Sequence, residues 1–154
     1  EAWRDIPTPL RVAGSGPLQN LVTDAEKYGV TYLGRLDAEA VYREMRRARF
    51  LVFSSVWYEP FGLVLIEAFA AGLPVVAAKL GAPADIVSHG ETGLHFTAGD
   101  PKSLAEAVTW AAAHPEDMAR MGENARREYE LLYTPKANYA RLMDIYEQTI
   151  AEYN

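Results

Sequence analysis

The chain has 154 residues, of which 49% are hydrophobic and 23% are charged, a composition typical of one globular domain. Its net charge of −6 and its pI of about 5.1 exclude a strongly basic surface, so no nucleic-acid partner is expected and membrane association is not indicated. The absence of cysteine excludes disulfides and thiolate metal sites and fits a reducing compartment, so we expect a cytoplasmic protein.

Short apolar runs alternate with longer amphipathic segments, which predicts an α/β fold: a Rossmann-like parallel sheet with helices on both faces. In chain order, we expect the end of a helix at 1–5, a strand at 10–13, a helix at 18–28, a strand at 31–33, a helix at 38–48, a strand at 50–53 and an apolar helix at 62–72. We then expect a strand at 75–78, a short helix at 83–89, a strand at 94–97, a helix at 102–113, a helix from Pro115 and a final helix from Pro135 to about Glu152. No repeat or linker interrupts this order, so residues 1–154 are expected to form one domain.

Two glutamates, Glu59 and Glu67, lie in the otherwise apolar segment SSVWYEPFGLVLIEAFAAGLPVVA, residues 54–77. A carboxylate in apolar surroundings is costly unless it is paired. The turn at 60–62 leads into a helix that is apolar on every face and therefore expected to be buried, and the unpaired amides and the dipole at its start favour an anion. Gly62 leaves room for a ligand at the backbone, and Glu67 lies about 7.5 Å further along the helix axis. A ligand with a phosphate on these amides would therefore meet one carboxylate on each side.

Several stretches resemble motifs of a known family. EPFGLVLIE and AAGLPVVA are similar to the nucleotide-sugar-binding half of retaining glycosyltransferases of the two-domain GT-B architecture, family 4, also called glycosyl transferases group 1. The motifs that flank this region in the family are resembled by three further stretches, RVAGSGPL, TYLGRL and KLGAPADIVSHGETGLHFTAGDPKSLAEAV. The resemblance therefore covers essentially the whole chain. It implies a parent enzyme that transfers a sugar from a nucleoside-diphosphate sugar to an acceptor hydroxyl with retention of configuration.

The resemblance also implies roles for individual residues. Glu59 would contact donor-sugar hydroxyls close to the reacting carbon, which makes it the candidate catalytic residue. Glu67 would accept hydrogen bonds from the ribose hydroxyls. The amides that would bind the donor diphosphate are those around Phe61, Gly62, Leu63 and Val64, and the residues that would line the base site are Arg35 and Leu36. The sequence has no Asp-x-Asp motif and its three histidines are scattered, so no metal or other cofactor is expected.

The chain departs from the family pattern at its beginning. In the family, a first strand and a loop carrying an Arg and a Lys for the phosphates precede this region, and a whole N-terminal domain binds the acceptor. We therefore expect this chain to be a donor-binding fragment of a two-domain enzyme, with a central strand missing from its sheet and no activity by itself. Lys79, where the family often has a small or acidic residue, leaves the donor sugar open.

Other interpretations stay open at this point. A nucleotide-sugar epimerase or a phosphorylase of the same architecture, or a non-catalytic nucleotide-binding module, would share these motifs. An NAD-dependent dehydrogenase is disfavoured because Gln19 stands where its glycine fingerprint needs a third glycine. Glu59 could also be a solvated loop acid, Glu67 could pair with an Arg or Lys, and Gly62 could serve only to relieve turn strain.

Overall fold

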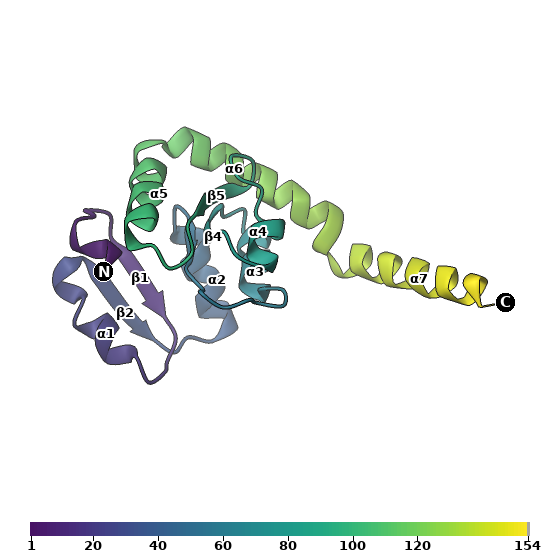
Figure 1. Cartoon of the computed structure of the whole chain (residues 1–154), viewed down its shortest axis with the longest axis horizontal. Helices are drawn as coiled ribbons and strands as arrows, with labels where there is room; N and C mark the ends of the chain where they lie inside the picture. The colour runs from purple at the N-terminus through teal and green to yellow at the C-terminus, as the bar shows by residue number, and fades with distance from the viewer. Residues whose placement is uncertain (154) are drawn as a thin grey trace.

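Strands and helices alternate along residues 1–153, the part of the chain that this computed structural model describes (Figure 1). The strands are β1 (Leu10–Ala13), β2 (Val30–Gly34), β3 (Leu51–Phe53), β4 (Val75–Ala78) and β5 (Gly93–Phe96). The α-helices are α1 (Gln19–Thr23), α2 (Ala38–Arg47), α3 (Leu63–Ala70), α4 (Ala82–Ile86), α5 (Pro101–Ala113), α6 (Pro115–Glu128) and α7 (Pro135–Glu152). Two 3₁₀ segments, η1 (Ala2–Arg4) and η2 (Glu26–Tyr28), and one π-helical segment, η3 (Tyr129–Tyr133), complete the order.

The strands form two parallel sheets. One sheet contains β1 and β2, and the other has the order β3-β4-β5. No described strand lies between β1 and β3, so one edge of each of these two strands has no strand neighbour. The predicted α/β fold with parallel strands and flanking helices is confirmed, but the strands do not make one continuous sheet.

Burial along the strands follows this division. All four residues of β4 are buried, as expected for a parallel strand with neighbours on both edges and helices on both faces. No residue of β3 is fully buried, although its sequence, Leu51–Phe53, is apolar throughout. The open edge of β3 accounts for the difference, because no described strand pairs with it and Leu51 and Val52 border a cavity there.

Helices cover both faces of the strands. On one face α2 and α3 pack against β3 and β4, with Met45, Leu65 and Phe69 in the core. On the other face α5, α6 and η1 cover β4, β5 and the β1–β2 sheet; the buried residues there are Val76, Ala78, Leu94, Phe96, Ala111, Met118, Met121, Trp3, Ile6, Val30 and Val108.

Two helix predictions are wrong. The expected continuous helix at 18–28 is divided into α1 and η2, because the chain leaves helical hydrogen bonding around Asp24 and neither segment buries a residue that would hold a longer helix in place. The expected burial of the whole 62–72 helix also fails. In α3 only Leu65, Ala68 and Phe69 are buried, whereas Leu63 is 71% exposed.

The last helix extends away from the rest of the molecule (Figure 1). Thr134 caps α7, since its hydroxyl accepts the amide proton of Ala137 at 3.2 Å. None of the described residues of α7 is buried, and several apolar side chains along it are exposed, among them Leu142 and Ile145. No helix in the described part of the chain is long and apolar enough to cross a bilayer.

Candidate functional site

The loop between β3 and α3 fixes the position of Glu59. The Ser55 hydroxyl donates to Glu59 Oε1 at 3.1 Å, and the amide of Trp57 donates to the Ser55 oxygen at 3.3 Å. A backbone bond of 2.9 Å from the Glu59 amide to the Trp57 carbonyl tightens the same turn. The carboxylate is half-buried, so Glu59 is an oriented side chain at the carboxyl end of β3, not a fully solvated loop acid.

The start of α3 presents unpaired backbone donors. Leu65 N–H donates to Gly62 O at 2.9 Å, but the amides of Gly62, Leu63 and Val64 have no acceptor among residues 1–153. These are the first amides of a helix whose dipole is positive at this end. The geometry that anion binding requires is therefore present here.

Gly62 is required by the backbone as well. Its φ of +80° lies in the left-handed region, and a Cβ at this position would meet Leu65 Cδ1 at 3.1 Å. Relief of turn strain is therefore a real function of Gly62. The same conformation turns the chain into α3 and leaves the following amides open, so the two interpretations are compatible.

Glu67 is exposed and lines a cavity together with Val64 and Ser54. No ion pair to Glu67 is present among the described residues, so the alternative of an acid paired with Arg or Lys in the fold is not supported. A free carboxylate at the edge of a cavity is available to accept hydrogen bonds from a bound hydroxyl.

Arg35 and Leu36 directly follow β2. Gly34, with a φ of +68°, ends the strand, and Asp37 begins α2 by accepting the Ala40 amide at 2.8 Å. Arg35 is exposed and Leu36 half-buried. Arg35 and Leu36 thus lie at the carboxyl end of a strand, like Glu59, but in the other sheet, and neither lines the cavity that Glu67 borders.

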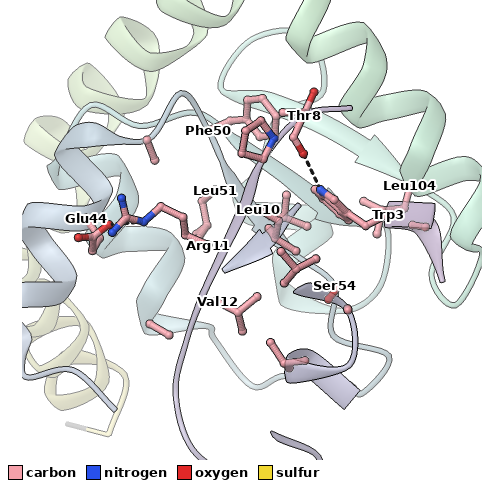
Figure 2. A pocket seen from close by; sticks show the side chains of 18 of the residues that line it. Trp3, Thr8, Leu10, Arg11, Val12, Glu44, Phe50, Leu51, Ser54 and Leu104 are labelled. Atoms are coloured by element: carbon pink, nitrogen blue, oxygen red, sulfur yellow. Dashed lines mark hydrogen bonds and ion pairs between the residues drawn. The ribbon is translucent and has the colours of Figure 1, made fainter. Parts of the chain in front are cut away.

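That cavity has a volume of about 1100 Å³ and runs between β1 and β3 (Figure 2). Of the residues predicted for donor binding, Val64 and Glu67 line it, whereas Glu59, Phe61, Gly62 and Leu63 do not. The candidate site therefore lies at the mouth of the cavity, where the loop 54–62 and α3 meet the carboxyl end of β3.

Two aromatic residues near this loop were not predicted from the sequence. The Tyr133 ring meets the Phe61 ring edge-on, with 6.3 Å between centroids. The pKa of Tyr133 is raised mainly by burial and, to a smaller extent, by the negative charge of the nearby Glu128. Tyr58 packs over Gly81, where an added Cβ would meet the Tyr58 ring at 3.3 Å. Both contacts join segments far apart in sequence, so no local pattern could have indicated them.

The structure also corrects the prediction for the histidines. His89 and His95 are not scattered, because their rings lie 5.6 Å apart and the His95 amide donates to His89 Nδ1 at 2.9 Å. Burial lowers the pKa of His95 below its usual value of 6.5, and its Nε2 is buried without a hydrogen-bond partner among residues 1–153. No group of three or more potential metal ligands is present in residues 1–153.

Comparison with known proteins identifies the family. The family model for glycosyl transferases group 1 matches residues 1–128. The chain belongs to this family. Among curated relatives, it is 32% identical over 140 residues to D-rhamnosyltransferase WbpZ of Pseudomonas aeruginosa, covering 87% of this chain and 37% of that protein. It is 36% identical over 125 residues to a glycogen synthase of Mycobacterium tuberculosis, covering 78% of this chain and 30% of that protein.

Solved structures give the same result for this group 1 glycosyl transferase chain. Sucrose-phosphate synthase from Thermosynechococcus elongatus matches with a TM-score of 0.80 and 31% identity, over 93% of this chain and 39% of that one. Anabaena Alr3699/HepE, solved in complex with UDP and glucose, matches in fold with a TM-score of 0.81 and 23% identity, over 95% of this chain and 43% of that one. The predicted membership of glycosyl transferases group 1 and the predicted GT-B fold are confirmed, and the chain spans less than half the length of these relatives.

Proposed function

We propose that this chain is the donor-binding domain of a retaining, family 4 glycosyltransferase that moves a sugar from a nucleoside-diphosphate sugar to an acceptor hydroxyl. The observation that carries the proposal is the set of unpaired amides at residues 62–64, with Glu59 before them and Glu67 after them in the sequence. Diphosphates bind well to such amides, and carboxylates are natural acceptors for sugar and ribose hydroxyls.

Each candidate residue has a defined part in this proposal. The amides around Phe61, Gly62, Leu63 and Val64 hold the diphosphate, and Glu67 holds the ribose. Glu59, oriented by Ser55, contacts the donor sugar next to the breaking bond. Arg35 and Leu36 border the base at the carboxyl end of β2.

Catalysis would be mainly electrostatic. Charge accumulates on the diphosphate as its bond to the sugar carbon breaks, and donors already fixed in position stabilise that charge without reorganising. Amides at the start of a helix meet this requirement, because the helix holds them in place. The proposal therefore needs neither a metal ion nor another cofactor.

Further parts of the proposal concern the whole protein. The acceptor would bind to an N-terminal domain outside this chain, and the parent enzyme would be cytoplasmic. In support of a nucleotide-sugar donor, Anabaena Alr3699/HepE has been solved with UDP-glucose, at 23% identity. We expect no glycosyl transfer by residues 1–154 alone, and robust turnover by this chain would contradict that part of the proposal.

Nucleotide binding tests the proposal directly. Chemical-shift titrations of the chain with UDP, GDP and ADP should show one preferred nucleotide, with the largest shifts at the amides of residues 62–64. Glu67→Ala should weaken binding of the preferred nucleotide by roughly 5- to 150-fold, because the ribose hydroxyls lose a charged hydrogen-bond acceptor worth about 1–3 kcal/mol.

A matched control separates this effect from a general loss of helix acids. Glu106 is exposed on α5, outside the cavity that Glu67 lines. Glu106→Ala should leave nucleotide affinity unchanged. Equal losses of nucleotide affinity in Glu67→Ala and Glu106→Ala would refute the assignment of the site. Chemical-shift changes confined to residues remote from α3 would refute it as well.

A further inference from the structure

The contact between Phe61 and Tyr133 joins the turn at residues 60–62, which leads into α3, to the segment that follows α6. The two ring centroids lie 6.3 Å apart, and the angle between the ring planes is 69°. This distance and this angle are those of an edge-to-face aromatic pair, which has a preferred geometry and contributes energy beyond the burial of its surface. The contact therefore restrains the orientation of each ring relative to the other.

The turn at residues 60–62 is not held by hydrogen bonds of its first two residues. No hydrogen bond to or from Pro60 or Phe61 is present among residues 1–153. Gly62 follows with a φ of +80°, and glycine populates positive φ values about as readily as negative ones. Packing of the Phe61 side chain, not hydrogen bonding, therefore fixes how the chain enters α3 and where the unpaired amides of residues 62–64 point.

Tyr133 has a firmer position than Phe61. Its ring is partly buried and packs against the core cluster that contains Leu65 and Phe69 of α3, two side chains with no exposed surface. Phe61, in contrast, is 43% exposed. Tyr133 thus connects an exposed ring in the turn to fully buried side chains of the helix that the turn begins.

The local structure around Tyr133 is unusual. η3 is π-helical, a rare conformation that occurs frequently at functional sites. Within η3, Tyr129 and Tyr133 pack against the core. Leu131 and Leu132 are 74% and 39% exposed, although leucine is buried in proteins more often than tyrosine. Apolar burial alone therefore does not explain which side chains of η3 face the core, whereas the contact with Phe61 accounts for the inward position of Tyr133.

We propose that Tyr133 is a positioning residue for the diphosphate of the donor. Its ring holds Phe61 in place and thereby directs the amides of residues 62–64 toward the bound anion. Tyr133 acts through Phe61 and does not itself contact the donor. The inference rests on the proposed function, because the anion is the diphosphate that this function assigns to the start of α3.

The order of the turn in the free chain gives a first test that needs no ligand. Nitrogen-15 relaxation of the backbone amides measures this order on the picosecond-to-nanosecond timescale. We expect order parameters of about 0.85 at residues 61–64 in the original chain and below about 0.6 in Tyr133→Leu, which keeps an apolar side chain but removes the ring contact. Unchanged order parameters in Tyr133→Leu would overturn the proposal.

Two matched variants show whether the effect comes from the contact with Phe61. Tyr133→Phe keeps the ring and should keep residues 61–64 ordered. Tyr129→Leu removes the other partly buried ring of η3 from the same core cluster, and Tyr129 makes no ring contact with Phe61 among the described residues. Tyr129→Leu should therefore also leave residues 61–64 ordered. Equal loss of order in Tyr129→Leu and Tyr133→Leu would assign the effect to η3 in general and overturn the proposal.

Binding measurements give a second test. The probes are UDP, GDP or ADP, whichever the titrations above select, and the free nucleoside with the same base. Tyr133→Leu should weaken binding of the nucleoside diphosphate by roughly 3- to 10-fold, the range that one aromatic pair supplies, and leave the affinity for the nucleoside unchanged. Phe61→Leu should cause the same loss, and the double variant should lose no more than either single variant, because all three remove one contact.

The outcomes separate this inference from the proposed function. If none of the three nucleoside diphosphates binds to the original chain, the proposed function fails, and the role of Tyr133 in holding a diphosphate fails with it. If one of them binds equally well to the original chain and to Tyr133→Leu, only the role of Tyr133 is refuted. Additive losses in the double variant would also refute it, because Tyr133 would then not act through Phe61.

Discussion

At the scale of single residues, Gly62 is subject to two separate constraints. Its φ of +80° is strained for any other residue, and an added Cβ would lie 3.1 Å from Leu65 Cδ1, on a fully buried side chain. Gly90 has a similar φ of +81° but open space around it. Substitutions at Gly62 and Gly90 therefore separate the free-energy cost of backbone strain from that of a packing clash.

We predict that Gly90→Ala lowers the free energy of unfolding by about 1–2 kcal/mol, through backbone strain alone. Gly62→Ala should lower it by about 1 kcal/mol more, because Leu65 has no room to move. Urea denaturation followed by tryptophan fluorescence measures both values. Equal losses at the two positions would show that the contact with Leu65 is unimportant.

The pKa of His95 makes stability depend on pH. Burial lowers this pKa below 6.5 in the folded chain, so the unfolded chain binds more protons as the pH falls through that value. We predict that the free energy of unfolding is highest above pH 6.5 and declines as the pH falls toward the folded-state pKa.

His95→Leu should remove this part of the pH dependence, and urea titrations between about pH 5 and 8 would measure it. His114→Gln serves as the control, because His114 is exposed at the end of α5, where it stacks on Trp110. The prediction would be contradicted if the free energy of unfolding of His95→Leu depended on pH in the same way as that of the original chain.

At the scale of elements, two helix caps of similar geometry have different consequences. Asp100 accepts the amides of Lys102 at 2.9 Å and Ser103 at 3.2 Å at the start of α5, which buries Val108 and Ala111. Thr134 caps α7, which buries none of its described residues. A cap contributes to global stability only when its helix is part of the cooperative core.

We therefore predict that Asp100→Ala lowers the free energy of global unfolding by about 1 kcal/mol. Thr134→Ala should leave global unfolding unchanged and reduce helical circular dichroism, because α7 frays independently. Tryptophan fluorescence reports the first effect and far-ultraviolet circular dichroism the second. A comparable loss of global stability in both variants would show that α7 is integrated with the rest of the fold.

At the scale of the whole molecule, the helices and strands up to η3 form the packed body and α7 extends from it (Figure 1). We predict that deletion of residues 135–154 removes helical signal but changes the free energy of unfolding by only about 0.5 kcal/mol, the range for surface changes. Denaturation of the shortened chain tests this. A large loss of stability, or loss of cooperative unfolding, would contradict it.

Much of the fold was predictable because the signals are local. Each of the five strands was placed within one residue of its observed ends, since short apolar runs between glycines and polar caps mark them clearly. The prediction of one helix at 18–28 was wrong because a continuous helix there would need buried residues, and neither α1 nor η2 has any. The contact between Phe61 and Tyr133 and that between Tyr58 and Gly81 join distant segments, so no local sequence pattern could indicate them.

The sequence by itself determined the order of strands and helices, the family, and the motif in which Glu59 and Glu67 flank the start of α3. These features depend on hydrophobic periodicity, on glycine and proline positions, and on residue spacing, all of which are encoded within a few turns of chain. Only the tertiary structure decided that Ser55 orients Glu59, that Glu67 borders a cavity and that β1 and β3 face each other with open edges. Those facts arise from how distant segments pack, because hydrogen-bond pairing between strands and access to solvent are properties of the assembled chain.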